Sequence, residues 1–598
     1  MPAGRNWNEV AETQLRNTPH TEIIFRKAND SMRHVVDLLG SGKVCIDHPG
    51  TTKINWHKDQ ISRVEWNPKT YFKLTKTVKG SGSDIKWVRE LSRGAHLVRL
   101  GQANQLAKVD PHTKRDPEDY AVEAIDQILS WIDNNPWPWG SNWQCTMDVG
   151  LRVINWLFTL DLIHEGQSIA NCSRMETILL SLYTHGKHIY DNPEKYAGGI
   201  TNNHYLSDLV AQTILGVSLQ FFYDSKKWYD DGLINLKKEL SKQFLPESGL
   251  CFEASTGYNR LDYELLIALD MVFENREIQI PSWLEETIER IGKSTKQLLK
   301  SNGEVPAFGD QDDGRVLDLF PHNYQNQKYL LGWIEHRTTS ESPESLWTSG
   351  PLDEQEGIDS VRADAFSFKD VGWHGWRMNY WDVTMICGPL GTNGTGGHSH
   401  NDQLSFDLAV NGVNICGDPG SFTYTSDPEM RNLYRSTQMH STVYVDAIEQ
   451  NSFDSLFKRG GAGKGVLSKW ERNGNGPFLF EGQFSGPYSH TRELILDQEN
   501  DILAGVDKIE INKSFKNIYW TLILSPGVET IQESVNSLRL KFGEVALILS
   551  VENNVTSKSG FIIDTISYAK SYGVSEVTSR IRCSLKNNVA FKWQLRKA

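Results

Sequence analysis

The apolar residues of this chain recur with one spacing in its first half and with another in its second. Between about residues 84 and 300 they recur every three or four positions, as in Val122, Ile125, Leu129 and Ile132. This spacing lines one face of an amphipathic helix. After about residue 360, short runs rich in β-branched and aromatic residues lie between turn residues, as in "DQLSFDLAVNGVNICG", and such runs predict antiparallel strands. We therefore predict an α+β multidomain protein, with a helical domain followed by an antiparallel β sandwich.

The helical half contains many consecutive amphipathic segments joined by short loops that carry Asn, Pro and Gly. Such segments must pack as antiparallel pairs, which a bundle, a solenoid or a ring of helix pairs would all satisfy. The polar stretch "SESPESLWTSGPLDEQEGID" separates the two halves. We predict an irregular or mixed region over residues 1–80, a helical domain over 81–340, a linker over 341–359 and a sandwich over 360–598.

Composition and charge exclude some classes of protein. The 598 residues carry a formal net charge of −13, and no block of Lys and Arg occurs. We therefore expect no nucleic-acid partner, which would need a basic surface. An anionic substrate remains compatible, because a cleft can be locally basic on an acidic protein. No apolar run is long enough to span a membrane, so we expect no membrane partner, and the sequence does not define the oligomeric state.

The N-terminal stretch "MPAGRNWNEVAETQL" lacks the charged and apolar regions of a secretory signal. We expect a cytoplasmic protein for the chain as written, and a periplasmic or secreted one if a leader has been removed. Seven cysteines without paired spacing indicate neither a zinc ribbon nor a disulfide framework.

Tryptophans are concentrated in one polar loop, "NNPWPWGSNW". Exposed aromatic rings among Asn and Gly are typical of surfaces that stack on sugars. Packing between helices would account for the same residues, so the loop alone leaves both interpretations open.

Two helix starts carry chemically active side chains. In "GGITNNHYLSDLV", Thr201 or Asn202 is a suitable N-cap, and Asn203 and His204 follow it. In "FEASTGYNRLDYELL", Ser255 or Thr256 can cap a helix that begins beside Tyr258 and Arg260. Simple capping explains either pattern, but His204 could act as a base near neutral pH, and a tyrosine beside an arginine could have a lowered pKa.

A glycine-rich run, "GTNGTGGHSHND", precedes His398 and His400. It lacks the Gly-Lys-Ser/Thr of a phosphate-binding loop. We expect these two histidines to lie on a strand, where both would point to one face. Asp418 follows in an Asp-Pro-Gly turn and His440 precedes another strand. Histidines with a carboxylate can hold a zinc-like or manganese-like ion, although buried histidines are often only hydrogen-bonded. In "EVPAFGDQDDGRVL", the acids do not have calcium-loop spacing, so we expect no metal there.

These segments together resemble the heparinase II/III-like polysaccharide lyases. The resemblance rests on "NNHYLSDLV", "FEASTGY", "PAFGDQDDGR", "GGHSHNDQLSFDLAVNGVNICGDPGSFTY" and "RSTQMHSTV", with "DIKWVRELSRGAHLVRLG" upstream. It covers the chain from about residue 84 to about residue 445. It implies an incomplete (α/α) toroid followed by an antiparallel β sandwich. It also implies cleavage of a uronic-acid glycan by β-elimination, which leaves a 4,5-unsaturated uronate.

The resemblance also implies roles for individual residues. Asn203 would neutralise the uronate carboxylate, and Tyr258 would protonate the leaving group and could also take the C5 proton. His204 would serve as a base for the opposite epimer or contact the carboxylate, and His398 would close the site from the sandwich. His400, Asp418 and His440 would hold a structural divalent metal ion (zinc, manganese or calcium). If so, the chain must bend near His398, which Gly394, Gly396 and Gly397 could allow. The residues with weaker support as substrate contacts are Arg93, Asn142, Trp143, Asn202 and Arg260.

The expected partner is therefore an anionic polysaccharide, most simply a glycosaminoglycan such as heparan sulfate, chondroitin sulfate or hyaluronan. Alginate or a bacterial exopolysaccharide fits the same mechanism. A glycoside hydrolase on an (α/α) toroid would need two carboxylates, for which Glu253 with Asp262 or Asp310 are the nearby candidates. A non-catalytic glycan-binding protein is a third alternative.

Overall fold

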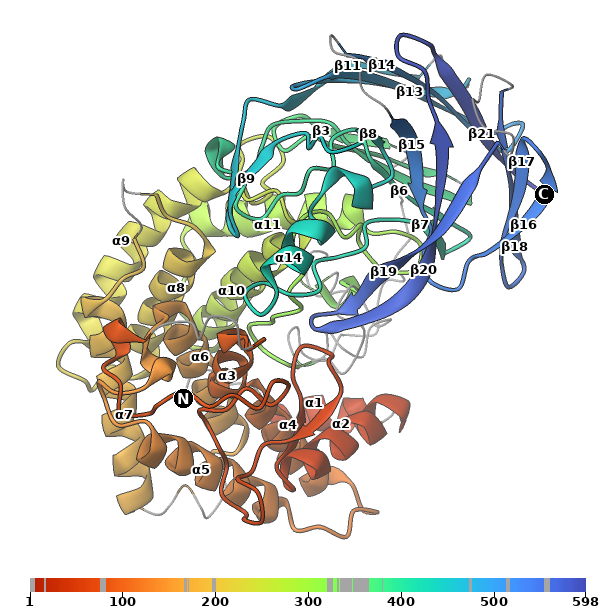
Figure 1. The fold of residues 1–598 in the computed structure, drawn as a ribbon. Coiled ribbons are helices and arrows are strands. Elements are labelled where there is room, and N and C mark those ends of the chain that lie inside the picture. Colours follow the sequence, from red (N-terminus) through yellow and green to blue (C-terminus); the bar gives the residue numbers. More distant parts are fainter. Residues whose placement is uncertain are drawn as a thin grey trace.

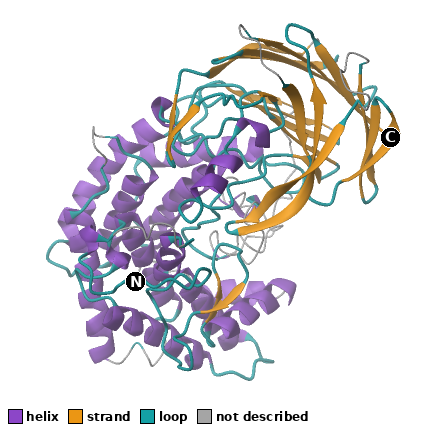
Figure 2. Cartoon of the chain, viewed as in Figure 1, coloured by secondary structure: helices purple, strands orange, loops and turns teal. Residues whose placement is uncertain are grey.

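The computed structural model describes residues 6–15, 18–75, 82–165, 169, 172–195, 200–319, 326–330, 333, 347, 365–378, 380–472, 476–511, 517–552 and 560–598. Within these residues the N-terminal half is mostly helical and the C-terminal half is mostly β-strand (Figures 1 and 2). The predicted change of period near residue 360 is therefore confirmed. The predicted linker, residues 341–359, lies outside the described residues apart from Trp347.

The helices of the N-terminal half pack in two layers. Along the inner layer α4 contacts α6, α6 contacts α8, and α8 contacts α10, while α5, α7, α9 and α11 pair with them from outside. This is the helix-pair arrangement of an incomplete (α/α) toroid. The helices are α3 (Ile85–Arg93), α4 (Ala95–Val109), α5 (Pro117–Asn134), α6 (Thr146–Leu162), α7 (Cys172–Asp191), α8 (Asn203–Ser218), α9 (Ser225–Gln243), α10 (Thr256–Asn275) and α11 (Ser282–Leu298).

The first 75 residues belong to this helical domain. Helices α1 (Trp7–Leu15) and α2 (Thr18–Ser31) both contact α4, and their apolar residues join the same hydrophobic core. The rest of this segment consists of turns with one short hairpin, β1 (Val35–Asp37) and β2 (Lys43–Cys45). The sequence did not predict the two helices within residues 1–80.

The C-terminal strands, as far as the structure describes them, form a five-stranded, a four-stranded and an eight-stranded sheet, with a separate β9–β10 hairpin. Their pairings are antiparallel, as predicted. The five-stranded sheet comprises β3 (Ala365–Phe368), β4 (Trp373–Met378), β5 (Trp381–Ile386), β6 (Phe406–Val410) and β7 (Val413–Cys416). The four-stranded sheet has the order β19 (Ile562–Ser571), β20 (Val574–Ser584), β15 (Ile518–Ile523) and β8 (Val443–Val445).

The eight-stranded sheet has the order β11 (Lys464–Arg472), β12 (Phe478–Ser485), β13 (Ser489–Asp497), β14 (Ile502–Glu510), β21 (Phe591–Lys597), β18 (Val545–Val551), β17 (Ser537–Phe542) and β16 (Glu529–Ser534). The hairpin consists of β9 (Ser452–Ser455) and β10 (Lys458–Gly460), and a short helix, α14 (Pro428–Tyr434), precedes it. Asn411 and Gly412 join β6 to β7 with φ values of 52° and 76°. Two positive φ values are those of a type I′ turn, which fits the predicted hairpin at "VNG".

The contacts between the halves include an apolar core and the tip of a hairpin. A small apolar core joins Leu298 and Phe308 of the helical half to Trp373 and Ile386 of the first sheet. On the other side, the β19–β20 hairpin reaches the helical half, where Tyr572 donates from its hydroxyl to Asp84 Oδ2 at 2.6 Å. The two domains therefore meet along a defined interface. No helix in the described part of the chain is long and apolar enough to cross a membrane.

Candidate active site

A cleft of about 630 Å³ lies where the two domains meet. Its helical wall includes Asn202, His204 and Tyr258, and its sandwich wall includes His398 and Tyr424. The two motifs that the sequence placed at helix starts and the glycine-rich segment of the sandwich therefore face one space. A larger cavity, of about 940 Å³, lies between the α2–β1 region and the sandwich and is lined by none of the predicted site residues.

Tyr258 and His398 stack face to face in this cleft, with ring centroids 3.8 Å apart. Ser255 caps α10 by accepting a hydrogen bond from the Tyr258 amide at 3.1 Å, as the sequence predicted. The Tyr258 hydroxyl donates to Asp312 Oδ2 at 3.1 Å and lies 3.3 Å from the hydroxyl of Tyr424. Burial and the nearby charges of Asp312 and Asp310 raise the pKa of Tyr258 well above its usual range.

The expectation of a lowered tyrosine pKa beside Arg260 is therefore wrong. The Arg260 guanidinium is buried and donates to the carbonyl oxygen of Gly314, and its Nε lies 3.7 Å from Glu264. Burial, followed by the charges of the acids around the tyrosine hydroxyl, sets the direction of the pKa shift. The Tyr258 hydroxyl therefore carries its proton in this structure.

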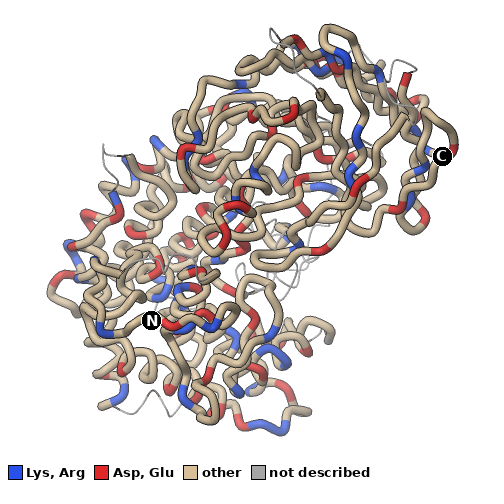
Figure 3. The backbone as a smooth tube through the Cα atoms, in the orientation of Figure 1, with Lys and Arg blue, Asp and Glu red and all other residues tan. Residues whose placement is uncertain are grey.

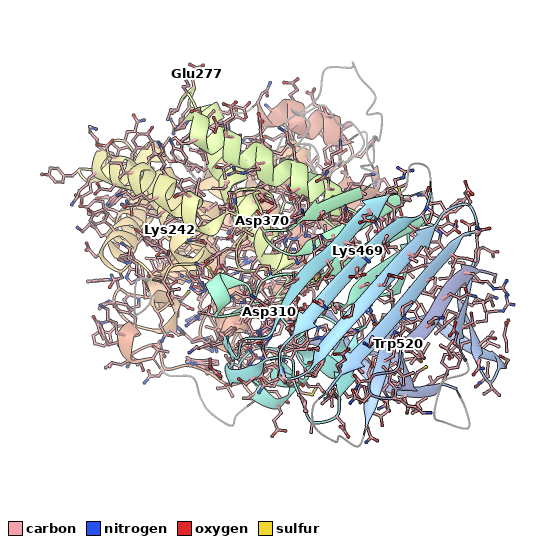
Figure 4. The ribbon with its side chains drawn as sticks, turned by 90° about the horizontal axis from the view of Figure 1, so that it is seen from above. Lys242, Glu277, Asp310, Asp370, Lys469 and Trp520 are labelled. Carbon is pink, nitrogen blue, oxygen red and sulfur yellow. The ribbon has the colours of Figure 1, made fainter. Side chains whose placement is uncertain are left out.

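Asp310 joins the two histidines of the sandwich segment. Its Oδ2 accepts from His398 Nδ1 at 2.8 Å and its Oδ1 from His400 Nε2 at 3.0 Å, while both oxygens accept from the Arg431 guanidinium. Burial alone would raise the pKa of Asp310, but Arg431 and the two histidines hold it well below its usual range. Figure 4 shows Asp310 where the helices meet the strands.

The two histidines do not lie on a strand, so that expectation was wrong. His398 and His400 lie in the loop between β5 and β6, because β6 begins only at Phe406. Gly394 and Gly396 have φ values of 92° and 59° in this loop. The loop backbone therefore lets the rings of His398 and His400 take different surroundings: His398 lines the cleft, and His400 is buried behind it.

Asn202, Asn203 and His204 form the start of α8. Asn202 is the N-cap and accepts from the His204 amide at 3.2 Å, as predicted. The His204 ring lines the cleft, and its Nδ1 lies 2.7 Å from Glu194 Oε2. The side chain of Asn203 is fully buried, and its Oδ1 has no hydrogen-bond partner among the described residues. A buried polar atom without a partner is uncommon and often marks a functional position.

His400, Asp418 and His440 converge behind the cleft. His440 Nε2 lies 2.9 Å from Asp418 Oδ2, and His400 Nδ1 lies 3.4 Å from the same oxygen. The two ring nitrogens are 3.2 Å apart, and all three side chains are buried. The structure thus brings together the three residues predicted as metal ligands.

Basic side chains also line the cleft, including Lys86, Arg89, Arg93 and Lys458. Arg93 donates to Asp148 and to Glu90, in both cases at 2.7 Å. Lysines and arginines are interspersed with acids over the whole chain (Figure 3). The cleft lining therefore carries both signs of charge, since Asp84, Asp148, Glu253 and Asp312 line it as well.

Asn142 and Trp143 are not placed at the cleft. The Asn142 amide donates to the carbonyl of Trp56 and to the side chain of Asn135, both at 2.9 Å. Trp143 donates to the Asn135 carbonyl at 3.0 Å and is buried. Arg260 is likewise buried away from the lining residues. These three proposed substrate contacts are therefore corrected: in this structure they pack the helical domain.

Different tryptophans of this loop fit each of the two interpretations that the sequence left open, sugar stacking and helix packing. Trp137 is 53% exposed and Trp139 44% exposed, whereas Trp143 is in the core. Trp143 therefore packs in the core, whereas Trp137 and Trp139 present exposed rings on which a sugar could stack.

Several cleft residues were not identified from the sequence. Tyr424 contacts the Tyr258 hydroxyl, and Phe457, at the tip of the β9–β10 hairpin, packs edge-on against His398 with centroids 5.9 Å apart. Arg431 donates to Asp310, and Asp312 accepts from the Tyr258 hydroxyl. Tyr424 and Asp312 belong to quoted motifs, "GSFTY" and "GDQDDGR", but residue type alone does not distinguish them from neighbouring turn residues. No local pattern marks Phe457.

The toroid, the sandwich and a tyrosine–histidine cleft between them define a class of two-domain polysaccharide lyase folds. The heparinase II/III N-terminal profile matches residues 29–330, and the heparinase II/III-like C-terminal profile matches residues 360–593. The chain therefore belongs to the heparinase II/III family.

Two characterised relatives are similar to this chain over about two thirds of its length. It is 25% identical to a heparin-sulfate lyase of Pedobacter heparinus, over 66% of this chain and 57% of that protein. It is 20% identical to a heparin-sulfate lyase of Bacteroides stercoris, over 67% of this chain and 56% of that protein. The matched part thus spans little more than half the length of each relative.

Solved structures show the same fold. A crystal structure of heparinase III superposes with a TM-score of 0.70 and 16% identity, covering 96% of this chain and 85% of that one. The heparan sulfate lyase of Pedobacter heparinus gives a TM-score of 0.56 and 18% identity, over 96% and 83% of the two chains. The predicted fold class is confirmed.

Proposed function

We propose that this protein is a polysaccharide lyase that cleaves a uronic-acid glycan, of the glycosaminoglycan class, by β-elimination. The observation that carries the proposal is that Tyr258 and His398 stack on each other across the domain interface, while His204 lines the same cleft. The names of the two relatives, both heparin-sulfate lyases, favour a glycosaminoglycan. Alginate or a bacterial exopolysaccharide would react by the same steps.

The first task of such an enzyme is to make the C5 proton of the uronate acidic. Removing it builds negative charge on a carboxylate that is already anionic, and hydrogen-bond donors aimed at that carboxylate lower the cost. We assign this role to the side-chain amide of Asn203, which is buried at the start of α8 between the cleft-lining residues Asn202 and His204. His204 is suited to either contacting the carboxylate or acting as a base, since Glu194 accepts from Nδ1 and so leaves the lone pair of the neutral ring on Nε2.

The second task is to transfer protons. The C5 proton passes to a base, the C4=C5 double bond forms, the C4–O4 bond breaks, and an acid protonates O4. Tyr258 is neutral because its pKa is raised, so it suits the role of acid. His398, oriented by Asp310, lies against its ring and encloses the reacting centre from the sandwich side.

We also propose that His400, Asp418 and His440 hold a divalent cation in a structural role. The donor set fits. Asp310 accepts from His400 Nε2 and the Ser436 carbonyl accepts from His440 Nδ1 at 2.8 Å, so the other ring nitrogens, which face Asp418 Oδ2, are the ones that would bind the ion once they are deprotonated. Such outward hydrogen bonds are typical of histidine ligands, and ligand atoms about 3 Å apart suit a zinc-like or manganese-like ion. The ion would brace the loop that carries His398.

The hydrolase alternative finds less support. It needs two carboxylates that reach opposite sides of one bond. Asp310 is saturated by Arg431 and two histidines, and Asp262 is fully buried within α10. Of the three acids considered, only Glu253 lines the cleft.

A substrate panel tests the proposal. Heparan sulfate, chondroitin sulfate, hyaluronan and alginate are incubated separately with the protein, and near-ultraviolet absorbance from an unsaturated uronate is followed. Absorbance with at least one glycan is expected. New reducing ends without absorbance would indicate hydrolysis, and saturable binding without either product would indicate a binding protein. Both outcomes contradict the lyase.

A further inference from the structure

A second group of metal-ligating side chains lies in the cleft wall, apart from the sandwich histidines. It consists of Cys145 at the N-cap of α6, Glu194 in the segment before α8, and His204 in the first turn of α8. One ligand atom of each lies within 4.8 Å of the others. Cys145 and His204 line the cleft, so an ion can reach the group from solvent.

The distances suit a tetrahedral thiophilic cation. Cys145 Sγ lies 3.5 Å from Glu194 Oε2 and 3.7 Å from His204 Nδ1. With Zn–S near 2.3 Å and Zn–N or Zn–O near 2.0–2.1 Å, tetrahedral ligand atoms are about 3.3–3.6 Å apart. The histidine and glutamate atoms are closer, at 2.7 Å, because they now share a hydrogen bond. A cation would replace that proton and require these two atoms to separate slightly.

Further acidic side chains lie close to this group. Asp208, which is buried, accepts from the Glu194 amide at 2.7 Å through Oδ2. Its Oδ1 has no hydrogen-bond partner among the residues that the structure describes. Burial and the charges of Asp148 and Glu194 raise the pKa of the Cys145 thiol well above its usual range. A thiophilic cation that binds here would release the thiol proton, because the thiolate is the metal ligand.

We propose that Cys145, Glu194 and His204 form a second metal site, specific for a thiophilic divalent cation such as Zn²⁺, in the wall of the cleft. Because Cys145 and His204 line the cleft, a fourth ligand from solvent or from a bound substrate would reach the cation from that side. Occupation takes His204 out of its hydrogen bond with Glu194 and places a cation beside Asn202 and Asn203. The cation therefore inhibits the reaction, a consequence that rests on the proposed function. The proposal that the metal site exists does not depend on that function.

Cadmium binding tests the site independently of activity. Cd²⁺ is titrated into the reduced protein, and the ultraviolet thiolate-to-metal charge-transfer absorption is followed. The sandwich cluster contains no thiol and cannot produce this absorption. We expect an absorption band that saturates at one Cd²⁺ per chain and is absent in Cys145→Ser. In Glu194→Gln, which keeps the thiol and the side-chain shape, Cd²⁺ should bind at least tenfold more weakly.

Cys45→Ser is the matched control, because Cys45 is exposed on β2 and its loss should leave the band unchanged. Absence of a saturable band in the wild type, or its persistence in a folded Cys145→Ser protein, overturns the site. If Cys145→Ser does not fold by circular dichroism, unchanged Cd²⁺ affinity in Glu194→Gln overturns it equally. Inhibition is tested with Zn²⁺, each variant being compared with its own zinc-free rate, and at least tenfold lower sensitivity is expected in Cys145→Ser. Equal sensitivity refutes the inhibitory role, whereas a protein inactive on every glycan still leaves the cadmium result decisive.

Discussion

Asp310 Oδ2 accepts a hydrogen bond from His398 Nδ1 at 2.8 Å, although the two residues are 88 positions apart and lie on different domains. Its other oxygen accepts from His400. One carboxylate thus orients the histidine of the cleft and a ligand of the proposed metal ion, so the two sites are mechanically joined. Asp310 acts through these histidines and is a positioning residue.

Asp310→Asn should therefore lower both activity and stability. Loss of the orienting carboxylate should reduce kcat about 10–100-fold, as is usual for groups that support a ligand or a catalytic histidine. Arg431 would be left buried without its anion, which costs about 3–5 kcal/mol. Steady-state kinetics and denaturant unfolding measure the two effects.

Asp507→Asn is the matched control. Asp507 is also buried and accepts from an arginine and a histidine, Arg492 and His490, both at 2.7 Å. It lies on β14 in the sandwich, so its loss should reduce stability while the folded fraction keeps its kcat. Wild-type kcat in Asp310→Asn would show that His398 needs no such support.

Tyr258→Phe should abolish most turnover. The substitution keeps the ring that stacks on His398 but removes the proton that the leaving oxygen needs, a loss of about 10²–10⁴-fold in kcat. His398→Ala should be similarly inactive. The measurement is the near-ultraviolet rate on the glycan found by the panel. Tyr488→Phe is the control, since Tyr488 is a buried tyrosine that donates to the Val443 carbonyl within the sandwich. Unimpaired turnover in Tyr258→Phe would refute the assignment.

Local sequence patterns were sufficient to predict most of the helices and strands and the candidates for the helix caps. The caps Asn202 and Ser255 were each one of two predicted candidates, because a cap requires only a short polar side chain just before an apolar helical stripe. The meeting of Asp310 with His398 could not be predicted, because the contact depends on how two separately folded halves dock. The same limit applies within one loop: Trp137 is exposed and Trp143 buried, and only the packing of the neighbouring helices distinguishes them.

Removing the proposed sandwich metal should lower stability more than it changes the chemistry of the protein that stays folded. A ligand that binds only the native state adds about 2.7 kcal/mol at 100 times its Kd. We expect a chelator to lower the Tm of the wild type and to leave the Tm of His440→Ala unchanged. Metal content is measured in parallel. Equal chelator effects on both proteins would place the stabilising ion elsewhere.

The stability of the sandwich should fall as pH drops from about 6.5 towards 4. His374 is fully buried on β4, between Ser367 Oγ at 2.8 Å and the Cys387 carbonyl at 3.2 Å. Burial lowers its pKa to about 4. Below the unfolded-state pKa of about 6.5, the unfolded chain binds a proton that the folded one excludes, so stability is complete above that pH and is lost as pH falls.

His374→Gln should flatten this dependence by up to about 1.4 kcal/mol per pH unit across that interval. The measurement is the midpoint of the sandwich's own unfolding transition in denaturant at pH 7.5, 6 and 5, because a two-domain chain need not unfold in one step. His112→Gln is the control: His112 is exposed in the loop before α5, so its replacement should leave the slope unchanged. An identical pH slope in His374→Gln and the wild type would mean that other buried groups, not this imidazole, set the acid sensitivity of the domain.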